Sequence, residues 1–162
     1  MAENNLHFVK LESKTDPTGF TSDTQLVVVK AVVVGKDVPT ADGPLGDNPK
    51  HVDGETYCHD LLGGTWKQTF KDNSFRKQYA TETFTYDSVK DIFIQTQPHA
   101  SWSLDENNDW QAPVTFPTDR GTDEDPKFIS WDEAGQKWIA LDNSDPVNTF
   151  NWDASGLIWV SA

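Results

Sequence analysis

The sequence predicts a mainly β protein: an N-terminal β region with one short α-helix, followed by serial β-hairpins. Three observations predict this class. A Val-rich run follows residue 25, one short helical pattern lies between residues 53 and 64, and a hairpin pattern recurs four times after residue 84. We expect the N-terminal β region to span residues 1–80 and the tandem aromatic hairpins to span residues 81–162.

Two strands are expected before residue 36. Residues 6–12 alternate weakly between apolar and polar side chains, and residues 25–35 contain six Val residues. Periodicity alone leaves a helix open for the second run, but β-branched side chains favour a strand, here one buried on both faces. Residues 36–54 contain three Pro and three Gly among polar residues and are expected to form a long loop.

One short helix is expected next. Asp53 can cap it, Tyr57, Leu61 and Leu62 fall on one helical face, and Gly63 can end it. Residues 66–70 then alternate as a strand. We expect the central core to contain the large side chains of Trp66, Phe70, Tyr79, Phe84, Tyr86 and Phe93.

The second half of the chain repeats one short design. Each copy has an aromatic residue or Leu, an Asp, four or five turn-forming residues and a second large aromatic residue, over residues 86–93, 104–110, 131–138 and 152–159. Asp can accept hydrogen bonds from backbone amides two residues on, and rings on the two arms of a hairpin face each other. The turns are therefore expected to be closed by the side chains of Asp87, Asp105, Asp132 and Asp153.

Prolines between the repeats are expected to separate one hairpin from the next, because proline cannot continue a sheet ladder. A lone two-stranded hairpin is marginal in water. The four hairpins must therefore stack on each other, on the N-terminal strands or on another protein chain. The prolines concerned are Pro98, Pro113, Pro117, Pro126 and Pro146.

Composition limits the classes of partner. Thirteen Lys and Arg against twenty-six Asp and Glu give a formal charge of −13, and no basic stripe is present, so direct nucleic-acid binding is not expected. The chain has no stretch of eighteen apolar residues and no apolar, basic leader, so we expect neither membrane insertion nor secretion. Synthesis in a cytosol is expected.

No constellation indicates catalysis, a cofactor or a metal. Cys58 is the single cysteine, and its spacing from His51 and His59 fits no standard zinc arrangement. The acidic loop 119–125 lacks the pattern of a calcium loop. No nucleophile motif or phosphate loop is present, so an enzyme is not expected.

The tryptophans allow two interpretations. Buried rings would supply the core of a chain with few aliphatic residues, whereas exposed rings would form an interaction surface or a flat platform for sugar rings. Exposure of Trp102, Trp110 and Trp138 on one face would favour the platform. The candidate interaction residues are Trp102, Trp110, Trp131, Trp138, Trp152 and Trp159.

Four segments carry a resemblance to a known family. They are the stretches Tyr-Cys-His-Asp-Leu-Leu-Gly-Gly-Thr-Trp at 57–66, Phe-Arg-Lys-Gln-Tyr-Ala-Thr at 75–81, Phe-Thr-Tyr-Asp-Ser-Val-Lys-Asp-Ile-Phe-Ile at 84–94 and Ala-Ser-Trp-Ser-Leu-Asp-Glu-Asn-Asn-Asp-Trp from residue 100. With the later Phe-Ile-Ser-Trp-Asp-Glu at 128–133, they resemble a family of small, uncharacterised or virion-associated proteins of marine tailed phages, especially cyanophages. The resemblance covers most of residues 52–141.

The resemblance implies a component of the phage particle, made in the host cytoplasm and present in the virion. We expect a structural accessory protein that attaches in multiple copies to capsid or tail subunits, as decoration, cement or a tail accessory. The alternative is a carbohydrate-binding module on the virion that aids adhesion to the host envelope or to glycans.

Overall fold

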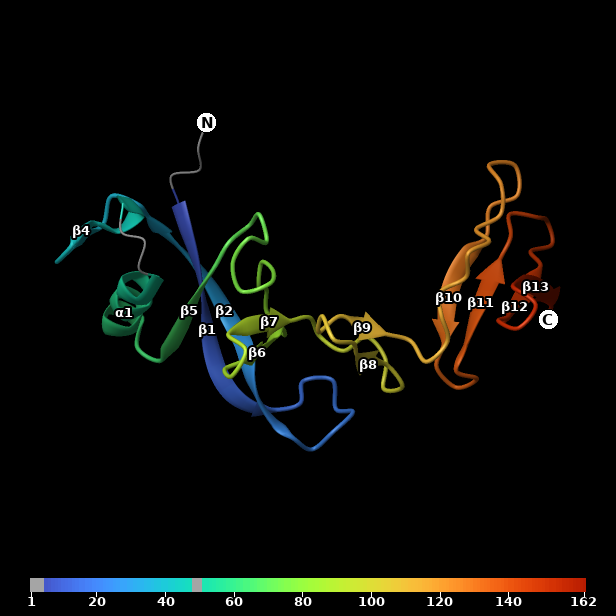
Figure 1. Cartoon of the computed structure of the whole chain (residues 1–162), viewed down its shortest axis with the longest axis horizontal. Helices are drawn as coiled ribbons and strands as arrows, with labels where there is room; N and C mark the ends of the chain where they lie inside the picture. The colour runs from blue at the N-terminus through green and yellow to red at the C-terminus, as the bar shows by residue number, and fades with distance from the viewer. Residues whose placement is uncertain (1–4, 48–50) are drawn as a thin grey trace. The chain divides into compact units, whose positions relative to one another are not determined.

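The computed structural model describes residues 5–47 and 51–162, and the described chain is mainly β (Figure 1). Strands hold 41% of the residues and helices 9%, which confirms the predicted fold class. The chain forms two compact units, an N-terminal unit up to Thr96 and a C-terminal unit from Gln97. The division lies beyond residues 80 and 81, because the first predicted hairpin pairs with the N-terminal sheet.

The N-terminal unit is built on a five-stranded antiparallel sheet in the order β5-β1-β2-β6-β7. The first two strands form a long hairpin that pairs from Asn5 and Gly35 to Thr15 and Thr24, with a bulge at Lys10/Leu11. Its strands are β1 (Asn5–Thr15), β2 (Thr24–Gly35), β5 (Thr65–Thr69), β6 (Thr85–Asp87) and β7 (Ile92–Ile94).

The Val-rich run is the predicted strand, but the expected burial of both its faces is wrong. Val27 and Val28 are buried, whereas Val33 is 58% exposed. The side chains of Val32 and Val34 pack on the core beneath the helix, and the opposite face of this part of β2 is open to solvent.

The expected long loop contains regular structure. A tight hairpin of β3 (Pro39–Thr40) and β4 (Gly43–Pro44) leads into a 3-10 turn, η1 (Leu45–Asp47), and the helix α1 is His51–Leu62. Gly63 ends the helix with a positive φ of 66°, as predicted, and its amide donates to the carbonyl of His59. Asp53 lies inside the first turn and is not the cap.

Two small cores stabilise the N-terminal unit. One gathers Val9 of β1, Val28 of β2 and Phe93 of β7, and the other places Phe8, Cys58 and other side chains between the sheet and α1. Of the expected core side chains, Trp66, Tyr86 and Phe93 are buried, and Phe84 and Tyr79 are partly buried. Phe70 is 37% exposed, because β5 ends at Thr69 and the chain turns away.

The C-terminal unit contains one two-stranded and one four-stranded antiparallel sheet (Figure 1). The larger sheet has the order β10-β11-β12-β13. Its strands are β10 (Phe128–Asp132), β11 (Lys137–Leu141), β12 (Thr149–Asp153) and β13 (Ile158–Ser161), and the smaller sheet pairs β8 (Ser103–Leu104) with β9 (Trp110–Gln111).

All four predicted hairpins form, and in each the two large residues of the repeat are direct cross-strand partners. The pairs are Tyr86 with Phe93, Leu104 with Trp110, Trp131 with Trp138, and Trp152 with Trp159. Facing side chains in such pairs stabilise a hairpin, which explains the repeated spacing.

Proline does not separate the last two hairpins. Pro146 lies between β11 and β12, which nonetheless pair from Ile139 and Asn151 to Leu141 and Thr149. The bend that contains Pro146, with a cis bond after Asp145, brings the two hairpins into one sheet.

Candidate functional site

Three of the four repeat aspartates close their turns as predicted. The carboxylate of Asp87 accepts hydrogen bonds from the amides of Val89 and Lys90, at 2.9 and 3.0 Å. Asp105 accepts from the amides of Asn107 and Asp109. Asp153 accepts from Ser155 and Gly156, chiefly through the Ser155 hydroxyl, and these bonds lower the pKa of its carboxyl.

Asp132 does not act in this way among the described residues. The third turn is closed by its backbone, where the amide of Gln136 donates to the carbonyl of Glu133. The side chain of Glu133 instead accepts from the hydroxyl and amide of Ser101 at 2.7 and 2.8 Å, and from Trp131 Nε1 at 2.8 Å. These bonds lower the pKa of Glu133 and tie the third hairpin to the segment before β8.

One face of the four-stranded sheet carries its tryptophans and is covered by the same unit. Register places Trp131, Trp138, Trp152 and Trp159 on this face. Trp138 Nε1 donates to the carbonyl of Val114, and Trp159 Nε1 donates to the carbonyl of Asp119, so the segment before β10 lies against these rings. We call this the aromatic face.

The six candidate tryptophans are therefore not an exposed surface. Trp138 and Trp152 are buried and the other four are partly buried. Neighbouring indoles meet at steep angles, 69° for Trp131 and Trp138 and 59° for Trp152 and Trp159. Among the described residues they do not make the flat, solvent-facing platform that stacking on sugar rings requires.

The opposite face of this sheet exposes apolar side chains. Because side chains alternate along a strand, cross-strand pairs place these residues on the side away from the tryptophans, with Asn151 and Asp153 of β12 between the β10–β11 group and the β13 group. Phe128 is 58% exposed, Ile158 53%, Val160 46% and Leu141 42%. We call this the outer face, made of Phe128, Ile139, Leu141, Ile158 and Val160.

The charge of the chain is concentrated in the same unit. Residues 97–162 hold twelve Asp and Glu against three Lys and Arg, a net charge of −9, whereas residues 1–96 hold fourteen against ten. The outer face, which also carries Asp132, Lys137 and Asp153, therefore lies in a strongly negative field. Such a field repels a second copy and attracts a basic partner.

A pocket of about 470 Å³ lies in the C-terminal unit beside the aromatic face. Trp102, Trp110 and Trp138, the three residues named for a possible platform, line it together with Phe116. We call it the indole pocket. Trp102 Nε1 is buried and has no hydrogen-bond partner among the described residues.

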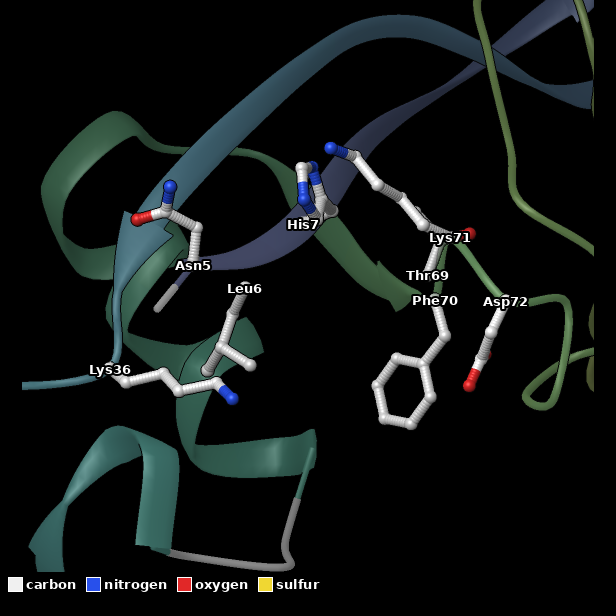
Figure 2. Close-up of a pocket in the computed structure, with 8 residues that line it drawn as sticks. All are labelled: Asn5, Leu6, His7, Lys36, Thr69, Phe70, Lys71 and Asp72. Carbon is white, nitrogen blue, oxygen red and sulfur yellow. The ribbon is translucent and has the colours of Figure 1, made fainter. Parts of the chain in front are cut away.

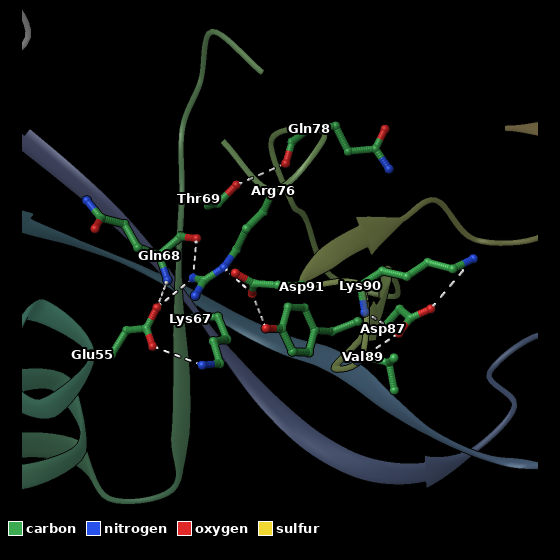
Figure 3. Close-up of polar contacts among 11 residues, drawn as sticks. Glu55, Lys67, Gln68, Thr69, Arg76, Gln78, Asp87, Val89, Lys90 and Asp91 are labelled. Carbon is green, nitrogen blue, oxygen red and sulfur yellow. Dashed lines mark hydrogen bonds and ion pairs between the residues drawn. The ribbon is translucent and has the colours of Figure 1, made fainter. Parts of the chain in front are cut away.

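A buried ionic network lies in the N-terminal unit and was not predicted from the sequence (Figure 3). The side chain of Arg76 is 2% exposed and lies between Glu55 of α1, at 2.5 Å, and Asp91 of the first hairpin, at 2.6 Å. It also donates to the carbonyl of Gln68, at 3.0 Å. Residues 76 and 77 take left-handed φ values of 53° and 73°.

Glu55 and Asp91 have further partners in this network. Glu55 also accepts from Lys67 Nζ and from the amide of Gln68. Tyr86 donates a short hydrogen bond to Asp91. Burial raises the pKa of Tyr86, while burial of Asp91 is outweighed by its bonds to Tyr86 and Arg76, so the pKa of that carboxyl is lowered. These groups hold α1, β5 and the first hairpin together.

A second cavity, of about 280 Å³, lies at the start of β1 and the end of β5 (Figure 2). The side chains of Lys36 and Lys71 reach towards it from opposite sides, with Leu6, His7 and Phe70 on its walls. None of the predicted site residues lies here.

Other candidate chemistry is sparse. Cys58 is buried among apolar residues, and burial raises the pKa of its thiol to about 11. Among residues 5–47 and 51–162, no three His, Cys, Asp or Glu side chains are grouped as metal ligands. Within the same ranges, no helix has the length and hydrophobicity to cross a membrane.

Comparison with known proteins gives no relative: no family model, no curated protein and no solved structure matches this chain.

Proposed function

We propose that this protein is a structural accessory of a phage particle, which binds the capsid or tail surface in multiple copies and performs no catalysis. The observation that carries the proposal is the outer face of the C-terminal sheet. Four large apolar side chains are 42–58% exposed there, two on β10 and β11 and two on β13, on either side of the polar residues of β12. Exposed apolar patches on soluble proteins mark interaction sites.

The repeated hairpins support the same role. The rings of the last two hairpins pack on the aromatic face of the four-stranded sheet, which presents Phe128 and Val160 on its other side. A rigid surface needs little ordering when it binds, which favours attachment. The motifs at residues 57–66 and 128–133 resemble those of phage proteins and indicate the particle as the place of attachment.

The first test asks whether the protein is part of the particle. Mass spectrometry of purified particles of the encoding phage should find the chain in many copies per particle. Recombinant protein should also co-sediment with particles from which it has been removed. Its absence from particles would overturn the proposal.

The second test asks whether the outer face makes the contact. The double substitution Phe128→Ser with Val160→Ser should reduce co-sedimentation at least tenfold, because it removes the two opposite ends of the apolar surface. Both side chains are largely exposed, so folding should be little affected. Val89→Ser, at a position 94% exposed in the N-terminal unit, is the matched control. Equal binding of the double variant and the control would exclude this face.

A further inference from the structure

The indole pocket is lined largely by aromatic rings. Its lining includes Trp102, Trp110, Gln111, Thr115, Phe116 and Trp138. The ring centroids of Trp102 and Trp138 are 5.9 Å apart with planes at 68°, and those of Phe116 and Trp138 are 4.9 Å apart with planes at 69°. Each pair packs edge to face, so the wall presents inclined rings, unlike the coplanar rings that stack on a sugar.

The surroundings of the pocket are negative. The unit carries a net charge of −9, and of its three basic residues none lines the pocket, while Arg120 contacts the ring of the wall residue Phe116. The side chain of Gln111, on the pocket wall, donates to Asp105 at 2.9 Å. Glu133 accepts from Trp131, whose ring packs on Trp102 and Trp138. Carboxylates are thus connected to the walls at two points.

Basic side chains of this unit lie over its aromatic rings. The guanidinium of Arg120 lies 5.0 Å from the ring centroid of Phe116, and Lys127 Nζ lies 4.6 Å from that of Phe150. Two of the three basic residues of the unit therefore contact an aromatic face. The face of an aromatic ring is the negative part of its quadrupole and attracts cations.

We propose that the indole pocket receives the side chain of a Lys or Arg presented by a partner protein. Inclined π faces, a negative field and linked carboxylates together favour a cation over a neutral group of the same size. The identity of the partner as a particle subunit rests on the proposed function, but the binding chemistry of the pocket does not.

The test compares two probes of nearly equal shape. N-acetyl-arginine amide is a cation, and N-acetyl-citrulline amide replaces the guanidinium with a neutral urea. NMR shifts of the indole N–H groups, followed during titration of the intact protein, should show the arginine probe binding about five- to thirty-fold more tightly. The shifts should be largest for Trp102, Trp110 and Trp138. The affinity should fall when salt is raised from about 0.05 to about 0.5 M, because the electrostatic screening length becomes shorter over this range.

Variants of the wall locate the site. Phe116→Leu and Trp110→Leu each remove one π face and should weaken the arginine probe about three- to thirty-fold. Phe20→Leu, which changes a 43% exposed ring of the N-terminal unit, is the matched control and should leave the affinity unchanged. Near-UV circular dichroism checks that each variant is folded, and Phe116, at 42% exposure, is the substitution least able to disturb packing.

Three outcomes would overturn the proposal. Equal affinity for the two probes would show an apolar groove without preference for charge. Saturable shifts with neutral oligosaccharides, and none with the arginine probe, would show a glycan site. Unchanged affinity in both Phe116→Leu and Trp110→Leu would place the cation elsewhere. Because no particle is needed, failure here leaves the co-sedimentation result intact, and failure to find particle binding leaves this result intact.

Discussion

Single aspartates close turns throughout the chain, and most of these turns can be predicted from the sequence. The bonds of Asp87, Asp105 and Asp153 are local, so neighbouring residue types predict them. An Asp that is followed two residues later by Thr, Ser or Gly, as Asp153 is by Ser155, marks four more turns outside the aromatic repeats. These are the turns of Asp16, Asp72, Asp119 and Asp142.

Asp142 provides a test that depends on pH. Bonds from the side chain and amide of Asn148 lower its pKa from 3.8 to about 2. A carboxyl with a lowered folded pKa stabilises the fold above its unfolded pKa, and this contribution is lost as pH falls towards the folded value. Asp142→Ala should therefore lower the melting temperature at pH 7, and its difference from the wild type should shrink between pH 4 and pH 2.

Calorimetry at pH 7, 5, 3 and 2 measures this difference in dilute protein. Asp123→Ala removes an exposed carboxylate of the same unit and controls for the change in net charge. A difference for Asp142→Ala that stays constant down to pH 2 would show that the ionised carboxylate does not hold the bend.

Arg76 is the residue whose loss should cost most in the N-terminal unit. Removing one partner of a buried ion pair leaves the other without compensation and costs about 3 kcal/mol or more. Arg76→Ala leaves Glu55 and the carbonyl of Gln68 with fewer donors in a buried place. Urea unfolding should show this loss of stability.

Asp91→Asn is the control for that measurement. Asp91 is half exposed, so its neutralisation should cost less than about 1 kcal/mol. Similar losses for Arg76→Ala and Asp91→Asn would show that solvent screens the network and that the packing around Arg76 holds the unit together.

The sequence predicts the individual hairpins well but does not show how they assemble. Tyr86 and Phe93, or Trp152 and Trp159, meet across a turn of a few residues, so spacing alone identifies them. The pairing of β2 with β6 joins Val27 to Thr85, far apart in the chain. The contacts of Arg76 with Glu55 and Asp91 are likewise distant in sequence, and no local pattern marks them.

The segment that covers the aromatic face depends on one glycine. Gly121 has a φ of 77°, and a Cβ there would lie 2.2 Å from the carbonyl oxygen of Asp125 and 2.9 Å from the amide nitrogen of Lys127. Backbone atoms cannot move aside as a flexible side chain can. Gly121→Ala should therefore destabilise the unit by more than the 1–3 kcal/mol of a left-handed alanine alone.

Tryptophan fluorescence during urea unfolding follows this change, because six of the seven tryptophans lie in the C-terminal unit. Gly156→Ala is the control: its Cβ would approach only side chains, at 3.1 Å from Asp153 and 3.3 Å from Ile158. If the two variants unfold at the same urea concentration, the segment adapts and the glycine is not required.

At the scale of the molecule, the sequence predicts two faces for each hairpin but not which one is covered. Alternation separates Trp131 from Phe128 on β10, and large rings are the usual choice for an interaction surface. Coverage of the tryptophans depends on bonds such as that from Trp159 to Asp119, forty residues away. The exposed surface is therefore the opposite one, which has fewer aromatic rings.

Charge should decide whether the outer face binds a second copy of the chain. At neutral pH the net charge of −13 opposes self-association, and near the pI of about 4.4 this repulsion disappears while the apolar side chains remain exposed. Light scattering should show separate molecules at pH 7.5 and association near pH 4.4. Phe128→Ser with Val160→Ser should suppress that association, whereas Val33→Ser in the N-terminal unit should not. Association that the double variant leaves unchanged would place the self-association surface on the N-terminal unit, where one side of β2 is also exposed. Loss of net charge near pH 4.4 removes the repulsion for both units, so it does not by itself select the surface.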